Sequence, residues 1–389
     1  MSSVDKLLRD WDRDHRTIVE GLSRIPKVLQ QQKLSRTEVV SKPLAPKPSG
    51  PISAPQTPPN RESYRETEEV PHIGSPLSAE GARWLKEHDP SIASACNSVK
   101  DGEVLEARTA VEAVCARHGL HRSDLQEHAD LLGFDIGTID DDAAHIKQMM
   151  QAIADDDGWT VSYNNELRVL YKHARNSKVH SVKLQAEFDA PIWHVMALMV
   201  EFDLTETWNA FMQDTTILYA NLPLLTCIYG ALWTPFFLFD ATVKAEAFDI
   251  GLEDKSVLVR LSDIPEDELA GYELPPAHKK RRRASVGWGS CFRLEALPPT
   301  PEGKHRVRAS AIAHLNPHLP FVPGFLVNFV LKVASPFGFK MMKKVLNELF
   351  KEPDSIFNKR IAMRPEVYQF CKDKTKILMK HFYGLDIDV

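Results

Sequence analysis

The order of apolar patterns after residue 140 constrains the fold of this chain more than any other feature. A helical pattern over 140–155 precedes two strand-like runs, a helix over 191–202, about five more strand-like runs, and a long apolar helix that begins at Pro323. The strand-like runs occupy 167–171, 179–188, 215–220, 236–248, 256–261, 287–297 and 306–314. Strands joined by short turns pair antiparallel, and so long a sheet needs a cover over its apolar face. The sequence therefore predicts an α+β fold in which the terminal helix covers an antiparallel sheet.

Two of the predicted strands carry small side chains on one face. Alternation places Val307, Ala309 and Ala311 together. The strand over 236–248 repeats the pattern with Val243 and Ala245. Alanine is too short to fill the space between a sheet and a helix, so two interpretations stay open: a close helix–sheet contact, or an internal space that suits one apolar ligand.

The terminal helix presents a broad apolar stripe that includes Leu326, Phe329 and Val330. We expect the segment 334–338 to break this helix, because Pro336 removes a backbone donor and clashes with the preceding turn. A broken apolar helix over a sheet of small residues is interpreted as a hinged lid. The alternative is an ordinary kinked core helix.

One segment has the length and apolarity of a membrane span. Residues 221–239 carry no formal charge. Pro223, Gly230 and Pro235 interrupt the segment, and strand-like runs flank it. Burial in a soluble core or beside an apolar cavity is therefore the preferred interpretation.

Composition divides the rest of the chain. The hydrophobic share is 43%, slightly low for a fully packed protein, and prolines accumulate over 35–76. We predict a helix over 1–34, a disordered Pro-rich linker over 35–76, a small helical region over 77–139, the sheet domain over 140–350 and a helical extension over 351–389. The first helix is interpreted as a binding segment for a protein partner or a membrane surface, or as a helix that packs on the same chain.

The sequence offers no catalytic or metal-binding motif. The five cysteines are scattered without a C-x-x-C pair, which argues against a zinc site or a disulfide framework. No H-E-x-x-H, G-x-S-x-G or phosphate-loop motif occurs. The net charge of −5 gives no general attraction to nucleic acid. We therefore expect no catalytic residues, no metal, no cofactor and no nucleic-acid partner. Without a signal peptide, the expected location is the cytoplasm, with contact at membrane surfaces.

A basic run between two predicted strands invites three interpretations. It comprises Lys279, Lys280, Arg281, Arg282 and Arg283, and Ser285 follows it. The run attracts anionic headgroups, or acts as a nuclear-localisation signal, or is a solvated loop without a role. Phosphorylation of the serine would weaken a membrane attraction.

Several short motifs, in this order, resemble those of the StAR-related lipid-transfer (START) family. The run 179–188 leads into Asp189-Ala190-Pro191, which is similar to the family's step from an apolar strand into a helix. Trp208-Asn209 resembles its tryptophan–aspartate step, with asparagine in place of the usual aspartate. The segment 322–328 is similar to the start of its C-terminal helix. The likeness covers about half of the chain, roughly residues 140–350.

The resemblance implies a helix-grip fold, in which a curved antiparallel sheet wraps around a long C-terminal helix. It also implies non-catalytic binding of one lipid, a sterol or a phospholipid, and its transfer between membranes or its sensing. The expected lipid-binding residues are Trp288, Val243, Ala245, Val307, Ala309, Ala311, Leu326, Phe329 and Val330. The alternatives are an enzyme that acts on a hydrophobic substrate on the same scaffold, and an adaptor that binds protein.

Overall fold

The computed structural model describes residues 73–387 except 175–176, 235–236 and 250–255. All of them belong to the unit Glu68–Val389. The helix predicted over 1–34 lies outside the described residues, and so does nearly all of the linker predicted over 35–76.

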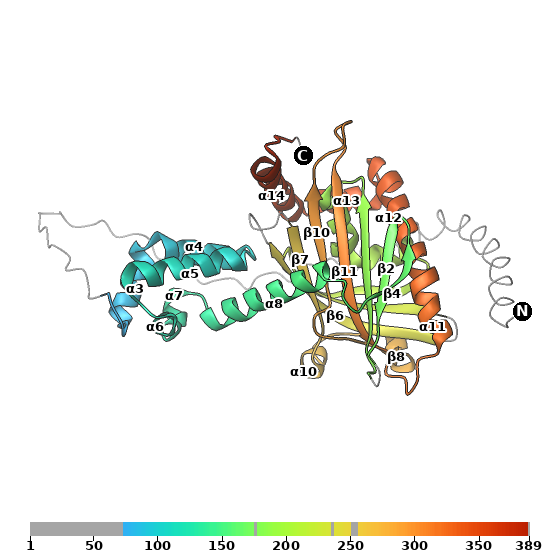
Figure 1. Cartoon of the computed structure of the whole chain (residues 1–389), viewed down its shortest axis with the longest axis horizontal. Helices are drawn as coiled ribbons and strands as arrows, with labels where there is room; N and C mark the ends of the chain where they lie inside the picture. Colours follow the sequence, from blue (N-terminus) through green and yellow to red (C-terminus); the bar gives the residue numbers. More distant parts are fainter. Residues whose placement is uncertain (1–72, 175–176, 235–236, 250–255, 388–389) are drawn as a thin grey trace, which may run out of the picture. The chain divides into compact units, whose positions relative to one another are not determined.

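A curved antiparallel sheet forms the centre of the structure (Figure 1). Its strands follow the order β1-β2-β3-β11-β10-β7-β6-β5-β4. Their bounds are β1 Thr160–Asn164, β2 Leu167–Lys172, β3 His180–Phe188, β4 Met212–Asn221, β5 Leu225–Thr234, β6 Phe237–Asp249, β7 Ser256–Asp263, β10 Cys291–Leu297 and β11 Arg306–Asn316. Two short strands, β8 (Arg282–Arg283) and β9 (Ser285–Val286), pair with β6 and β11. Together with the terminal helix across it, this sheet confirms the predicted α+β helix-grip fold.

Besides the short strands β8 and β9, two longer strands of the sheet were not predicted. The strand β1 forms a hairpin with β2, and β5 lies between β4 and β6. The strand β5 falls in the uncharged segment 221–239, whose described residues, 221–234 and 237–239, form a turn and sheet strands rather than a membrane span.

Six helices precede the sheet among the described residues. They are α3 (Ala79–His88), α4 (Pro90–Lys100), α5 (Val104–His118), α6 (Arg122–Gln126), α7 (Ala129–Leu132) and α8 (Ile136–Ala154). The Asp89 carboxylate accepts a hydrogen bond from the Ser91 amide and so caps the start of α4; it also binds Arg117 and His118 at the end of α5. The domain boundary predicted between residues 139 and 140 falls inside α8.

The helix α8 packs on one face of the sheet, which we call the outer face. Ile146, Met149 and Ile153 of α8 share a buried cluster with Leu258 and Ile312 of the sheet.

A fully buried lysine strengthens the contact between α8 and the outer face. The ammonium of Lys183 donates hydrogen bonds to the carbonyl oxygens of Ile153 and Asp155 at 3.2 and 2.6 Å, and to the Asp156 carboxylate at 2.9 Å. It thereby satisfies carbonyl groups that the end of a helix leaves without a partner.

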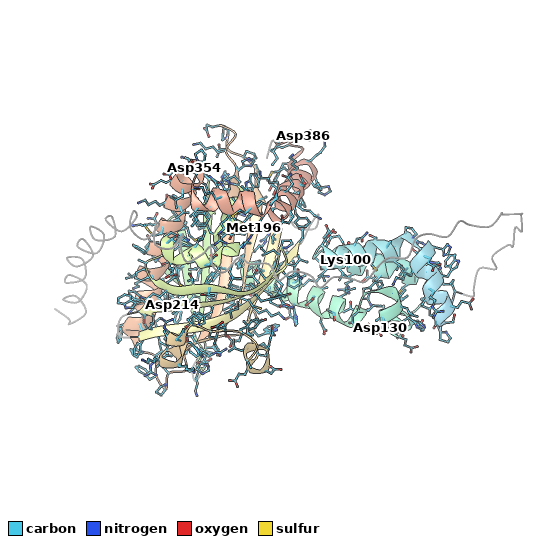
Figure 2. The ribbon with its side chains drawn as sticks, turned by 180° about the vertical axis from the view of Figure 1, so that it is seen from behind. Lys100, Asp130, Met196, Asp214, Asp354 and Asp386 are labelled. Carbon is cyan, nitrogen blue, oxygen red and sulfur yellow. The ribbon has the colours of Figure 1, made fainter. Side chains whose placement is uncertain are left out.

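The opposite face, which we call the inner face, meets α9 (Ile192–Val200) and the terminal helices. Figure 1 shows α8 in front of the strands, and Figure 2, seen from behind, shows α9 beside the labelled Met196 in front of them. Trp193 of α9 and Phe339 of the terminal helix share a buried cluster with Val307 and Leu294 of the sheet. A 3-10 turn, Phe202–Thr207, links α9 to β4.

The long terminal helix is continuous, contrary to the predicted break over 334–338. It runs through α11 (Gly324–Phe329), a π-helical turn (Val330–Ala334), α12 (Ser335–Glu348) and a final 3-10 turn (Leu349–Lys351). The π turn accommodates Pro336, because the Val330 carbonyl accepts hydrogen bonds from both the amide and the hydroxyl of Ser335. By length and composition this helix, Gly324–Lys351, could also cross a membrane. Its buried contacts with the sheet instead make it a cover.

The C-terminal segment predicted as an extension packs on the sheet domain. Its helices are α13 (Ile356–Met363) and α14 (Pro365–Tyr383). The fully buried carboxylate of Glu201, after α9, accepts hydrogen bonds from Arg364 at 2.8 Å and Tyr368 at 2.9 Å. Arg360 lies 3.4 Å from the same carboxylate. These contacts attach α13 and α14 to α9.

Candidate functional site

Strand register places the predicted small residues on one face of the sheet. Ala311 lies opposite Phe292, and Phe292 lies opposite Val259. Val259 in turn lies opposite Ala247, two residues beyond Ala245 on the same side of β6. The five predicted strand residues, Val243, Ala245, Val307, Ala309 and Ala311, therefore all belong to the inner face.

Val307 and Leu294 of the inner face are fully buried, but several other inner-face residues are less buried than their neighbours on the outer face. On the outer face Leu258 and Cys291 are fully buried, and Ile312 is 1% exposed. On the inner face Val243, Ala245, Ala309 and Ala311 remain partly accessible, although helices lie over them. Partly accessible neighbours on the inner face include Leu184, Phe292, Val257, Leu261 and Ala247. A densely packed interface would bury these side chains fully, so part of their surface is left uncovered beneath the helices. We call this incompletely covered region the inner space.

Aromatic side chains close one end of this inner space. Phe329 of α11 contacts Phe211 and Trp233, with ring centroids 5.5 and 6.1 Å apart. Val330 follows on the same helix and is partly accessible. Of the predicted helix residues, Phe329 and Val330 thus lie at this end of the space. Leu326 is buried in a separate cluster with Phe239 and Leu319.

Trp288, which was predicted as a lipid-binding residue, does not lie on the inner face. Its side chain is 67% exposed and meets the ring of His145 on α8, on the outer side of the sheet. Trp288 stands in a turn before β10, between two glycines, and Gly289 has φ +84°. This turn holds the indole on the surface.

The other end of the inner face borders α14. A cavity of about 40 Å³ there is lined by Ala247 and Val257 of the sheet, Met196 of α9 and Leu378 of α14. The turn between α4 and α5 reaches the same place, because a Cβ on Gly102 would lie 2.8 Å from Leu224.

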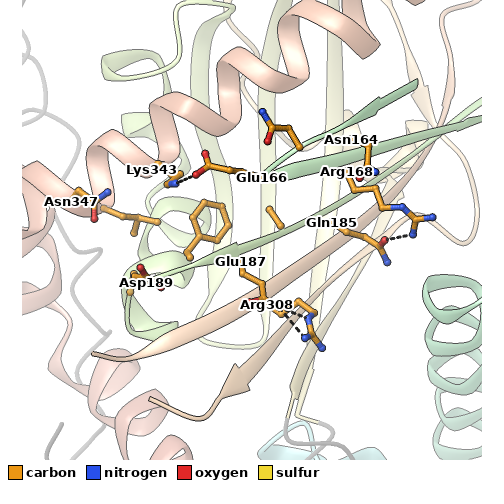
Figure 3. Close-up of a pocket in the computed structure, with 14 residues that line it drawn as sticks. Asn164, Glu166, Arg168, Gln185, Glu187, Asp189, Arg308, Lys343 and Asn347 are labelled. Atoms are coloured by element: carbon orange, nitrogen blue, oxygen red, sulfur yellow. Dashed lines mark hydrogen bonds and ion pairs between the residues drawn. The ribbon is translucent and has the colours of Figure 1, made fainter. Parts of the chain in front are cut away.

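An open pocket of about 850 Å³ lies where β3 meets α12 (Figure 3), and no pattern in the sequence indicated it. Its floor includes the buried side chains of Phe188 and Leu346. Its rim is charged: Lys343 binds Glu166 at 2.9 Å. On the same rim, Arg308 contacts Glu187 at 2.9 Å and Glu295 at 3.2 Å. Because the rim charges neutralise one another, the pocket has no strong preference for either sign of ligand.

The residues predicted as membrane-binding or regulatory divide into two groups. Arg281 pairs with Asp214 and donates to the Tyr229 hydroxyl at 2.9 Å, while Arg283 donates to the Thr242 hydroxyl at 2.6 Å. These two arginines are committed to contacts within the fold. Lys279, Lys280 and Arg282 are exposed.

The tyrosine that Arg281 contacts belongs to a buried polar cluster. Tyr229 donates to the Asp240 carboxylate at 3.0 Å, and His278 contacts the same carboxylate at 3.0 Å. Burial raises the pKa of Tyr229 to about 12, so its hydroxyl stays protonated and remains a hydrogen-bond donor. The cluster fixes the segment 276–283 on the outer face.

Two serine–histidine pairs bear on the enzyme alternative. Ser181 lies 2.7 Å from His314, and Ser285 lies 2.7 Å from His318. No carboxylate of the described residues is seen on the second ring nitrogen of either histidine, and Ser181 and His314 belong to the outer face. Burial lowers the pKa of His314 and weakens it as a base. In the described part of the chain no group of three or more His, Cys, Asp or Glu side chains could hold a metal ion.

No family model matches this sequence, and no curated protein matches it. Among solved structures, human STARD10 is 14% identical and covers 59% of this chain and 86% of its own, with a TM-score of 0.45. Human StAR-related lipid transfer protein 5 is 14% identical and covers 54% of this chain and 96% of its own, with a TM-score of 0.44. A STAR-related lipid transfer protein fragment from Xanthomonas axonopodis is 16% identical and covers 49% of this chain and all of its own, with a TM-score of 0.38. The fold of this chain is defined by its own strand order and terminal helix.

Proposed function

We propose that this chain binds one lipid molecule between the inner face of the sheet and the terminal helix, and exchanges it with membranes without chemical change. The observation that carries the proposal is the partial accessibility of the inner-face alanines beneath a covering helix. Such a space holds either water or an apolar guest, and an apolar lining favours the guest.

The chemistry of the lining supports a lipid rather than a polar metabolite. Ala309, Ala311, Phe292, Val257 and Leu261 present only carbon to the space. Transfer of apolar surface from water to such a lining is favourable by about 25 cal/mol per Å². A sterol or the acyl part of a phospholipid has that surface, and shape rather than charge would select between them.

Two measurements test the proposal. Native mass spectrometry of purified protein should show a bound mass that organic extraction identifies as a lipid. Labelled lipid should then move between donor and acceptor vesicles faster when the protein is present. Protein that is always empty, and that moves no labelled sterol or phospholipid, would reject the proposal.

A matched pair of variants links the transfer to the inner space. Ala311→Trp fills the space and should remove both the bound lipid and the transfer. Ala362→Trp makes the same change on the exposed side of α13 and should leave both intact. Equal transfer by the two variants would place the lipid elsewhere.

A further inference from the structure

Two segments that are distant in the sequence meet beside the first turn of the terminal helix. The first segment, residues 279–285, contains the exposed part of the basic run. The second segment, residues 317–325, comprises the loop before α11 and the first two residues of that helix. Ser285 lies 2.7 Å from His318, so a hydrogen bond joins them. Ala284 and Val322 also pack against one buried cluster, which contains Leu326. Figure 1 shows β8 and α11 at the same end of the sheet.

The surface formed by these segments combines exposed aromatic rings with exposed cations. Phe321 is 75% exposed and Phe325 is 43% exposed, which are high values for phenylalanine. Lys279, Lys280 and Arg282 of the first segment are exposed. Arg282 lies over the ring of Phe237, which packs against the same buried cluster as Leu326. No carboxylate of the described residues forms an ion pair with any of these three cations. We call Phe321, Phe325 and these three cations the aromatic–basic surface.

We propose that the aromatic–basic surface docks onto an anionic phospholipid bilayer, with Phe321 and Phe325 inserted between headgroups and the three cations at the phosphates. This inference rests on the proposed function and adds to it the surface through which the lipid is exchanged. Aromatic rings beside lysine and arginine are the composition that peripheral membrane surfaces use. The attraction is local, because the chain as a whole carries a net charge of −5.

The charge of the terminal helix agrees with this orientation. The segment 324–351 contains five lysines and one glutamate. Lys332, Lys340 and Lys344 are exposed on it. Of these, Lys332 lies about two helical turns beyond Phe325, so the start of the covering helix adds positive charge near the aromatic–basic surface.

A receptor for an extended basic peptide fits this region less well. Such a receptor would need neighbouring side chains of the run to be free, and Arg281 and Arg283 are bonded to Asp214 and Thr242 within the fold. The strand β8 is also paired with β6. Nuclear-import recognition would thus require the outer face of the sheet to come apart.

Flotation of the full chain with vesicles tests the docking surface. Wild-type protein should bind phosphatidylcholine vesicles that contain about 30% phosphatidylserine, and bind pure phosphatidylcholine vesicles much more weakly. Each lysine removed should weaken binding about fivefold, so Lys279→Gln with Lys280→Gln should weaken it roughly 25-fold. Phe321→Ser with Phe325→Ser should weaken binding at least as much, and added salt should not restore it.

A matched control surface is available on α14. Lys376→Gln with Ile377→Ser removes one exposed cation and one exposed apolar side chain from α14, outside the aromatic–basic surface, and should leave vesicle binding unchanged. Unchanged thermal unfolding of each variant shows that its fold is intact. An equal loss of vesicle binding in the control and the surface variants would overturn the proposal. Wild-type protein that does not bind anionic vesicles, or that binds RNA or a basic-peptide receptor more tightly, would also overturn it.

The outcome separates this inference from the proposed function. If the protein carries an extractable lipid but does not float with anionic vesicles, the proposed lipid binding stands and the proposed docking surface is rejected. If flotation depends on Phe321 and Lys279 but the protein never contains or transfers a lipid, the docking surface stands and the proposed function is rejected.

Discussion

Replacement of Ala311 by leucine gives opposite results for an open and a filled inner space. Ala311 lies on the inner face between Leu184 and Phe292, and all three side chains are partly accessible. Leucine adds three carbons, worth about 0.8 kcal/mol each when they are buried in free space. Lost rotamer freedom costs about 0.5–1 kcal/mol. The net expectation is a gain of about 1.5 kcal/mol in the free energy of unfolding.

A filled interior would reverse the sign of that change. Extra carbons in a close-packed core cost about 1–3 kcal/mol, because neighbouring side chains must leave their preferred rotamers. Ala231 provides the matched control, since it is fully buried on the outer face opposite Asp240. Ala231→Leu should lower the free energy of unfolding by about 1–3 kcal/mol.

Urea unfolding of delipidated protein measures both changes. Bound lipid must be removed first, because any ligand of the native state adds stability of its own. The reasoning is refuted if Ala311→Leu destabilises the protein as much as Ala231→Leu does. Ala311→Leu should also retain less lipid than wild type in native mass spectrometry.

Three further predictions concern other parts of the chain. Burial next to Lys372 lowers the pKa of His194 to about 4. Below the ordinary pKa of about 6.5, the folded state therefore binds fewer protons than the unfolded state. The stability contributed by neutral His194 is lost as the pH falls from about 6.5 towards 4. Between pH 7 and pH 5 that loss is about 2 kcal/mol, and the pH dependence of urea unfolding should shrink by this amount in His194→Gln. Lys183→Met leaves the carbonyls at the end of α8 unpaired and should cost about 3 kcal/mol of unfolding free energy, whereas Lys172→Met, at an exposed site that makes one hydrogen bond to the same segment, should cost under about 1 kcal/mol. Ser285→Asp places a negative charge in the aromatic–basic surface and should weaken flotation with anionic vesicles roughly fivefold or more, while Ser285→Ala should change it little.

Local periodicity carried most of the fold prediction. The strand 306–316 and the helix 324–351 were both recognisable, because each has one apolar face and the period of its own backbone. The strand β5 was not, because both of its faces are covered: Tyr229 and Ala231 are fully buried on the outer side, and Ile228 faces the inner space. A strand covered on both sides lacks the alternation that identifies a strand in a sequence.

The site was predicted less well where tertiary contacts decide the outcome. The inner-face alanines followed from alternation alone. Trp288 was also expected to bind lipid, but a glycine turn holds it at the surface. Pro336 suggested a broken helix, and the π turn with its serine hydroxyl restored the hydrogen bonding. The basic run looked uniform in the sequence. Only the fold shows that Arg281 is fixed inside it while Lys279 is free to meet a partner.

Different helices cover the two faces of the sheet, and their contacts bear on how a ligand would enter. The outer face is fixed by α8 through a continuous buried cluster and by Lys183, whose removal exposes unpaired carbonyls. Large movements of the strands would break these contacts. The terminal helix has buried contacts of its own through Phe339 and Leu346, but several residues beneath it, such as Ala311, are incompletely covered, and its π turn at 330–334 is a local irregularity in the helix. Since α11 also begins at the aromatic–basic surface, we expect a ligand to enter by movement of this helix at a bilayer, which would leave the contacts of α8 with the outer face intact.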